Sequence, residues 1–299
     1  MTLVIGSVHA DIGFLVADTL LNYPIEKYNP RNPALEKFHA LKIHILTPDV
    51  AIAFAGDVRT SRFLIRKLYQ EVMVNPTICV PARLVELRKE FAPQELDSTY
   101  GDYDFLVLLL TSEGRKLAKV TKDGFYFAAR AYIGDADEYK NFISLIGPYD
   151  GPLFCTIQNS NGTFITEPNL PTEGEQEFDQ VSTALERLTH QRNSETVGAI
   201  CGNITRVVDA RISRKLEYMQ SGASWTSPWE GKGGFSYLAS NSGTRGIGIY
   251  YSGWCTGLAF IAGDSETCRK MRAETLEQFI EEARLAYGLT LEGPVFNTT

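Results

Sequence analysis

Short apolar runs separated by turn residues fill the first 55 positions of the chain. Two of them, Leu3–Val8 and residues 12–17, are joined by a turn, and two more follow at residues 42–46 and Val50–Ala55. Runs of this length, bounded by turn residues, predict β-hairpins. The first hairpin would return Asp18 to the end of the strand pair at which residue 2 begins.

Apolar residues follow a helical spacing after the second hairpin. They recur every three or four positions over residues 60–74, 178–190 and 266–286, which predicts amphipathic helices there. Asp57 precedes the first of these helices and is placed to cap it. We expect further helices over residues 81–91 and 136–145, further strands over residues 105–111, 116–120, 124–131, 204–212, 236–239, 246–251 and 254–262, and a mostly irregular segment over residues 147–174.

The predicted elements are grouped as strands, helices, strands, helices and strands. This grouping favours an α+β fold, in which helices pack on sheets, over the strict alternation of a Rossmann-type fold. The sequence contains no internal repeat, low-complexity tract or linker. We therefore expect a single domain over residues 1–299, with a C-terminal helical extension from about residue 265.

Charge and composition narrow the classes of partner. The chain has 299 residues, of which 44% are hydrophobic, and 36 acidic and 29 basic residues give a formal net charge of -7. This balance argues against binding to nucleic acid or to an anionic membrane, which requires clustered Lys and Arg. No apolar run reaches the roughly 18 residues that cross a bilayer, and the N-terminus lacks the features of a secretory signal. We expect a cytoplasmic protein with no nucleic-acid or membrane partner.

Cysteine and histidine residues are few and dispersed. The five cysteines show no C-x-x-C spacing, and no two of the four histidines have the i, i+4 spacing typical of zinc hydrolases. We therefore expect no metal site and no cofactor.

The first residues of the chain carry the candidate chemistry. Removal of Met1 would leave Thr2 with both a hydroxyl and a free α-amino group, which are a nucleophile and its base within one residue. A threonine hydroxyl is a weak nucleophile until a base takes its proton. The α-amino group has an ordinary pKa of about 7.7–8.0, so a modest decrease makes it basic and mostly neutral at working pH.

One protein family combines these features. The chain resembles the proteasome β-type family of N-terminal-nucleophile hydrolases, which includes bacterial proteasome-like proteins, in Thr2, the strand pair that ends at Asp18, the hairpin from Lys42 and the Ala-Phe-Ala-Gly-Asp stretch of residues 53–57. The resemblance is clear over roughly residues 2–75, weaker over residues 103–200 and hard to trace beyond them. It implies a four-layer α/β/β/α sandwich and a threonine-type peptidase.

The resemblance also implies a role for each of five residues. Thr2 matches the nucleophile, and Asp18, sixteen positions later, matches the acid that orients the catalytic lysine. Lys42 matches that lysine, and its positive charge would lower the pKa of the neighbouring α-amino group. Ala53 falls where a backbone N–H group serves the oxyanion hole, and Asp135 falls in the loop that supports the free amino terminus.

The chain departs from the family pattern at several positions. The segment before Lys42 is longer than in the family and contains Lys27 and Lys37 as alternative lysines; Lys42 is favoured because it begins the strand that pairs with residues 50–55. Asp135 replaces a serine, and Asp209 is a guess at a later aspartate of the family.

Three functions follow from the resemblance. The first is an N-terminal threonine peptidase that acts on peptides inside a ring or other homo-oligomer, with the amphipathic helices over residues 60–74 and 266–286 as candidate subunit contacts. The second is a related amidase or acyl-transfer enzyme that uses the same nucleophile on a small amide. The third is a catalytically inactive assembly subunit of the same fold.

Overall fold

The computed structural model of the chain describes residues 3–19, 40–91, 103–149, 154–158, 164–168, 171–191, 204–209, 215–219, 235–240, 246–251, 255–264 and 268–292. These residues form helices and antiparallel sheets, which confirms the predicted α+β class.

The first sheet is built around the hairpin that starts the chain. Its strands follow the order β12-β11-β2-β1-β8, with antiparallel neighbours. Val4 pairs with Ala17 in the hairpin, so Asp18 returns to the start of β1, as the sequence predicts. On the other side of β1, Leu3 pairs with Gly134. The strands are β1 (Leu3–Val8), β2 (Gly13–Asp18), β8 (Arg130–Gly134), β11 (Ile204–Asp209) and β12 (Leu216–Met219).

The second sheet is a meander in which each strand pairs with the next one along the chain. Its order is β3-β4-β5-β6-β7, and all of its pairs are antiparallel. The predicted hairpin of residues 42–55 forms its first two strands. The strands are β3 (Ile43–Thr47), β4 (Val50–Ala55), β5 (Asp104–Thr111), β6 (Gly114–Thr121) and β7 (Gly124–Ala128).

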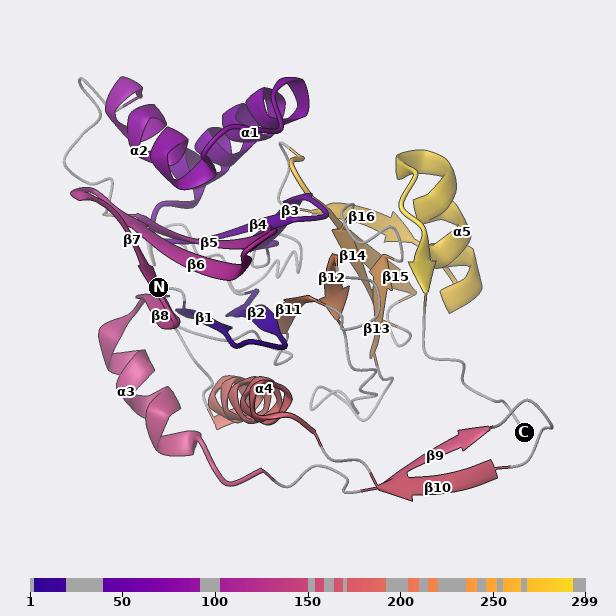
Figure 1. Cartoon of the computed structure of the whole chain (residues 1–299). Coiled ribbons are helices and arrows are strands. Elements are labelled where there is room, and N and C mark those ends of the chain that lie inside the picture. Colours follow the sequence, from indigo (N-terminus) through magenta and orange to yellow (C-terminus); the bar gives the residue numbers. More distant parts are fainter. Residues whose placement is uncertain are drawn as a thin grey trace.

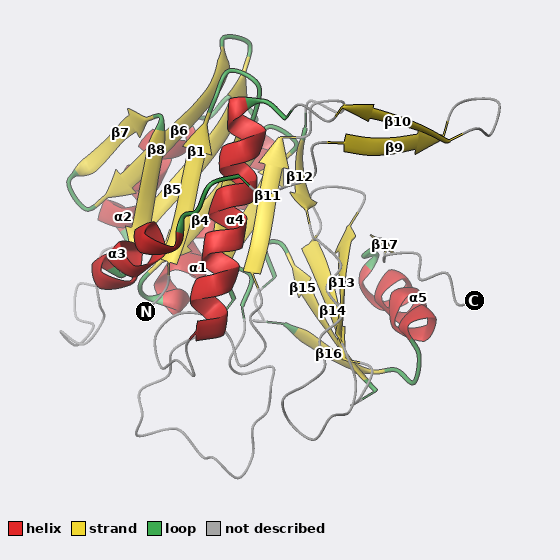
Figure 2. Cartoon of the chain, turned by 90° about the horizontal axis from the view of Figure 1, so that it is seen from below, coloured by secondary structure: helices red, strands yellow, loops and turns green. Residues whose placement is uncertain are grey.

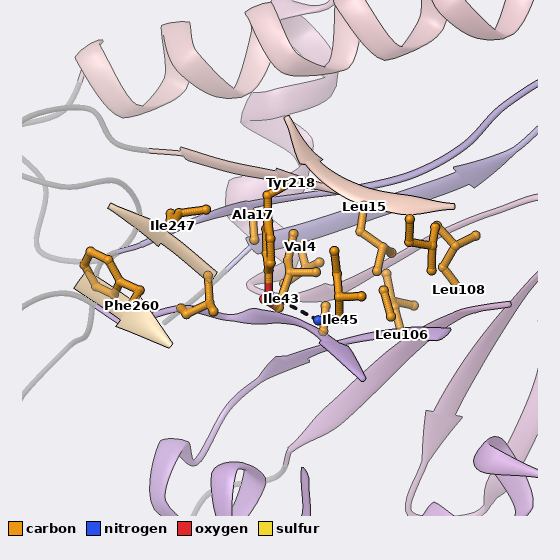
Figure 3. Close-up of a cluster of buried hydrophobic side chains, with 14 of the residues drawn as sticks. Val4, Leu15, Ala17, Ile43, Ile45, Leu106, Leu108, Tyr218, Ile247 and Phe260 are labelled. Carbon is orange, nitrogen blue, oxygen red and sulfur yellow. Dashed lines mark hydrogen bonds between the residues drawn. The ribbon is translucent and has the colours of Figure 1, made fainter. Parts of the chain in front are cut away.

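The two sheets pack face to face through a core of apolar side chains, part of which Figure 3 shows. Val4 from the first sheet and Ile43 and Leu106 from the second are fully buried in this core. The hydroxyl of Tyr218 on β12 joins the sheets, because it donates to Ile43 O (3.0 Å) and accepts from Ile45 N (3.1 Å). Each sheet thus covers the apolar inner face of the other.

Helices cover the outer face of each sheet (Figure 1). Leu64 of α1 and Leu84 of α2 share a buried cluster with Phe54 of the second sheet. On the first sheet, Leu185 of α4 shares a buried cluster with Ile5. The helices are α1 (Val58–Val74), α2 (Val80–Glu90), α3 (Ala136–Leu145) and α4 (Glu173–Gln191). The layers therefore follow the order helices, sheet, sheet, helices. No helix in the described part of the chain is long and apolar enough to cross a lipid bilayer.

A third sheet lies beside this body, towards the C-terminal end (Figure 2). Its order is β16-β15-β14-β13-β17, and α5 (Leu276–Tyr287) packs on it through the fully buried Phe279. Ile247 and Phe260 of this sheet enter the core between the first two sheets, which ties it to the body. The strands are β13 (Phe235–Ser240), β14 (Gly246–Tyr251), β15 (Thr256–Ile261), β16 (Arg269–Arg272) and β17 (Leu291–Glu292).

The helix predicted over residues 266–286 is wrong in its first half. Arg269–Arg272 form a strand in which Met271 is buried and its two neighbours are exposed, the alternation of period two that strands show. The helix begins only at Leu276. Met271 lies eight residues before Phe279, and residues eight apart also lie on one face of a helix. The sequence pattern therefore extended the predicted helix back to Met271. The extension predicted from about residue 265 is therefore a strand followed by a helix.

Three further elements differ from the sequence prediction. The segment 147–174, predicted to be mostly irregular, contains a hairpin of β9 (Phe154–Gln158) and β10 (Phe164–Pro168). The strand predicted over residues 124–131 is divided at Ala129, whose carbonyl accepts from Val8 N (2.8 Å), so that the chain passes from the second sheet to the first. The short strand β12 has no counterpart in the prediction.

Phe279 packs so closely on the third sheet that a methyl group at Gly257 has no room. The added Cβ would lie 2.0 Å from the Cδ2 atom of Phe279. We expect Gly257→Ala to lower the free energy of unfolding by about 1–3 kcal/mol, as overpacking does in other cores. Denaturant titration checks this. The control is Gly147→Ala, where the nearest atom, the Nη1 of Arg187, is 3.6 Å away; equal losses in both variants would contradict the close packing.

Candidate active site

A fully buried ion pair lies at the end of the molecule where β1 begins. The Nζ atom of Lys42 donates to Oδ2 of Asp18 at 2.8 Å, and both side chains are completely inaccessible to solvent. Asp18 is the last residue of β2, and Lys42 directly precedes β3. Lysine and aspartate side chains are almost never fully buried, and where they are, they are paired. This pair therefore distinguishes the site from the apolar core around it.

Backbone hydrogen bonds fix Lys42 between the two central sheets. The N–H group of Ala40 donates to Thr19 O (2.9 Å), just beyond β2 of the first sheet. Two residues later, Lys42 O accepts from the N–H group of Phe54 (3.1 Å) on β4 of the second sheet. Residues 40–42 therefore bridge the two sheets, and the ion pair lies at their junction.

The second carboxylate oxygen of Asp18 holds the start of β1. Its Oδ1 atom accepts from the backbone N–H of Leu3 (3.2 Å) in a buried contact. Leu3 is the residue that follows Thr2, and Thr2 itself lies outside the described residues. The ion pair is thus hydrogen-bonded to the first described residue of the chain.

The protonation of Lys42 depends on two opposing effects. Burial is the larger one, and it lowers the pKa of Lys42 below the ordinary lysine value because it disfavours the charged form. The charge of Asp18 and its hydrogen bond act in the opposite direction. Lys42 therefore releases its proton more readily than a lysine at the surface does.

The structure brings Asp18 and Lys42 together. Their contact joins the end of the first predicted hairpin to the start of the second. The alternative lysines, Lys27 and Lys37, lie outside the described residues.

The backbone of Ala53 does not face the ion pair. Ala53 is fully buried in β4, between Ile43 on β3 and Leu106 on β5. The N–H group of the next residue, Phe54, points to β3, where it donates to the carbonyl of Lys42. Successive N–H groups of a strand point to opposite neighbours, so the N–H group of Ala53 points to β5.

If the alternation of N–H groups continues one residue past β4, the next N–H group on the Lys42 side belongs to Gly56. Gly56 is exposed, and its φ of 99° is in the region that favours glycine. The sequence prediction missed this residue, because the direction of an N–H group depends on the strand pairing. The Gly-Asp pair that ends the apolar run of β4 is the signal that could have indicated it.

Asp135 lies at the same end of the first sheet. It follows Gly134, the residue paired with Leu3 across β1 and β8. Its side chain caps α3, where Oδ1 accepts from Asp137 N (2.9 Å) and Glu138 N (3.1 Å). The structure thus places Asp135 near the start of β1 and gives it the role of a helix cap.

Glu138 is a second acid near this end that the sequence prediction did not single out. It is 3% exposed and lies on the same face of α3 as Phe142, which packs in the cluster that contains Leu3. The Asp-x-x-Glu spacing of Asp135 and Glu138, typical of a helix start, was the available signal.

Asp209 belongs to the other end of the first sheet. Ile204 at the start of β11 pairs with Asp18, and Asp209 ends the same strand five residues later. The guess that Asp209 is part of the site is therefore wrong, because the antiparallel register directs it away. Within the described segments, no group of three or more His, Cys, Asp or Glu residues is placed to hold a metal ion.

No protein-family model matches the chain, and no curated protein matches its sequence. The geometry of the site is therefore the basis of the functional argument.

His44 lies within β3, two residues after Lys42, and is also a buried ionisable group. It is 2% exposed, and its Nδ1 atom accepts from the backbone N–H of Gly263 (3.3 Å) beyond β15. The imidazole must be neutral to accept this bond. Burial, with a smaller effect of Arg62, lowers the pKa of His44 to about 3. The uncharged imidazole of His44 thus links β3 to the end of β15 in the third sheet.

We expect the two charges of the ion pair to be strongly coupled. Lys42→Met or Asp18→Asn alone leaves a buried charge without its partner and should cost about 3–5 kcal/mol of unfolding free energy. The double variant should cost clearly less than the sum of the single costs. Denaturant titration of the four proteins measures the coupling. The exposed Lys140–Asp137 pair, with the same 2.8 Å separation, is the control and should show no measurable coupling; additive effects at Lys42 and Asp18 would contradict the buried pair.

His44 should make stability fall at acidic pH. Its folded pKa of about 3 lies below the unfolded value of about 6.5, so the stability that it contributes is complete above about pH 6.5 and is lost progressively towards about pH 3. His44→Asn keeps an acceptor for Gly263 N and does not titrate. We expect the stability difference between wild type and this variant to shrink by on the order of 1–3 kcal/mol between pH 7 and 4.5. Unfolding curves at several pH values give the free energy of unfolding of both proteins. A difference between the two free energies that stays constant with pH would exclude this role.

Proposed function

We propose that the protein is an N-terminal threonine hydrolase of the proteasome β type, with Thr2 as the nucleophile once Met1 is removed. The observation that carries this proposal is the buried Lys42–Asp18 pair, hydrogen-bonded to the backbone of Leu3, the residue after Thr2. The layer order of helices, sheet, sheet and helices supports assignment to the α/β/β/α N-terminal-nucleophile hydrolases.

In the proposed reaction, the Thr2 hydroxyl attacks the carbonyl carbon of a peptide or amide bond. The α-amino group of Thr2 takes the hydroxyl proton and gives it to the leaving amine. The product is an ester between Thr2 and the acyl part of the substrate, which water then hydrolyses to a carboxylic acid. No cofactor or metal ion enters these steps.

The ion pair has a defined part in this mechanism. A cationic Lys42 beside the amino terminus lowers the pKa of the α-amino group by like-charge repulsion, so that more of it is neutral and basic. Asp18 holds the ammonium group of Lys42 in a fixed position and anchors Leu3 at the same time. Both contacts are buried, and therefore solvent does not weaken them.

The oxyanion that forms when Thr2 attacks the carbonyl carbon requires a hydrogen-bond donor. This donor must lie on the Lys42 side of β4. We assign this donor to the N–H group of Gly56 instead of Ala53, because the N–H group of Ala53 points to β5. One donor of this kind contributes about 2.7–4 kcal/mol to transition-state stabilisation in other acyl-transfer enzymes. Asp135 supports the turn beside the start of β1 through its cap on α3.

Covalent labelling tests the mechanism. An electrophile that acylates N-terminal threonine should add once to the wild-type protein, on the first peptide, and intact mass should show that Met1 is absent. Thr2→Ala should not react, and Lys42→Met should react about 10²–10⁴ times more slowly because it lacks the cation that tunes the base. Lys37→Ala is the matched control and should react like wild type.

Two results would refute this assignment. One is a labelled protein that retains Met1, because the α-amino group of Thr2 would then be blocked. The other is loss of labelling in Lys37→Ala with normal labelling in Lys42→Met. Circular dichroism of each variant separates loss of reactivity from loss of fold. A folded wild-type protein that lacks Met1 and never reacts would instead favour an inactive assembly subunit.

A further inference from the structure

Strand β7 exposes three consecutive aromatic side chains at the margin of the second sheet. Phe125, Tyr126 and Phe127 are 38%, 53% and 53% exposed. In the described part of the chain, β7 is the last strand of its sheet and pairs only with β6. Figure 2 shows it at the outer margin of the molecule. The outer backbone edge of β7 is therefore available to another strand.

The aromatic residues lie on both faces of this edge. Successive side chains of a strand point to opposite faces, so Phe125 and Phe127 share one face and Tyr126 occupies the other. The rings of Phe125 and Phe127 are packed edge to face, with their centroids 5.8 Å apart. Edge strands usually carry charged residues or proline, which prevent pairing with other chains. Residues 124–128 contain neither.

We propose that β7 pairs with β7 of a second copy of this chain, antiparallel and about a two-fold axis. A two-fold axis brings a surface against itself, so a charged residue on or beside the axis would lie close to its own copy. An uncharged aromatic strand meets itself without this repulsion, and the rings gain contact across the axis. The two second sheets then form one continuous sheet through the dimer.

The helices predicted as subunit contacts pack their buried apolar residues within the chain, although Met73 and Val74 of α1 and Leu285 of α5 are exposed. Leu64 and Leu68 of α1 are buried on the second sheet, and Phe279 and Ala283 of α5 are buried on the third. Among the described residues, the aromatic side chains of β7 are 38–53% exposed and lie on a strand edge with no paired neighbour, a feature that the helices lack. This favours the strand over the helices as the contact. This proposal rests on the homo-oligomer expected under the proposed function, but not on the chemistry at Thr2.

Light scattering of the full-length protein tests the proposal. At micromolar concentration the wild type should have a mass of at least twice the 33.3 kDa of one chain. Phe127→Lys and Phe127→Glu should each associate about tenfold more weakly or worse, because each places like charges near the axis. Mixing these two variants should restore the dimer at low salt. Leu285→Lys is the control, because Leu285 is an apolar residue on α5 that is 69% exposed, more than Phe127, and this change should leave the mass unchanged.

Several outcomes would overturn the proposal. A monomeric wild type excludes self-pairing and leaves the strand to a partner of another kind. An oligomer that persists in both Phe127 variants places the contact elsewhere, as does a mixture that does not recover. Labelling of Thr2, measured on the same samples, keeps the two proposals separate, because loss of labelling would refute the hydrolase without changing the measured mass.

Discussion

Three segments of the chain depend on one buried carboxylate. Asp18 uses one oxygen for the ammonium group of Lys42 and the other for the backbone of Leu3, so it holds the start of β1, the end of β2 and the approach to β3 together. Neither charge reaches solvent, and the local dielectric is low. In such surroundings each contact is strong, and the loss of one partner leaves a costly unpaired charge in the core.

The arrangement of the sheets explains why the pair can be buried at all. The two central sheets cover each other along their length, and residues 40–42 cross from one to the other at the end where Asp18 lies. Backbone hydrogen bonds on both sides of this crossing satisfy the peptide groups around Lys42. The charged atoms are therefore enclosed by hydrogen-bonded backbone and by apolar side chains.

The sequence predicts those parts of the fold in which local pattern and tertiary packing agree. The first two hairpins and α1 follow from their apolar spacing, and Asp57 caps α1 as its position predicts, through a bond of 2.7 Å from Thr60 N. The pattern fails at β16 because Met271 fits a helical and a strand spacing equally well. It also fails at Ala129, where the strand bends because it changes sheets and not because of any local turn residue.

The candidate site shows the same division. The resemblance to the N-terminal-nucleophile family predicts that Asp18 and Lys42 lie together, and the structure brings them together at one end of the molecule. The direction of a backbone N–H group, however, depends on which neighbour each residue of a strand pairs with, and this register cannot be read from spacing. The sequence prediction therefore names Ala53 and misses Gly56. The same limit applies to Asp209, because an antiparallel strand places its two ends at opposite sides of the sheet.

Stability alone is a weak reason for a buried lysine and aspartate. Replacing a buried ion pair by apolar residues of similar volume is often neutral or stabilising, because removing two charges from water costs several kcal/mol for each ion. The attraction between Asp18 and Lys42 alone therefore does not explain why charged residues occupy these two positions. What apolar residues cannot provide is a positive charge and an acceptor for Leu3 N. In the function that we propose, these two properties act on Thr2, the residue before Leu3.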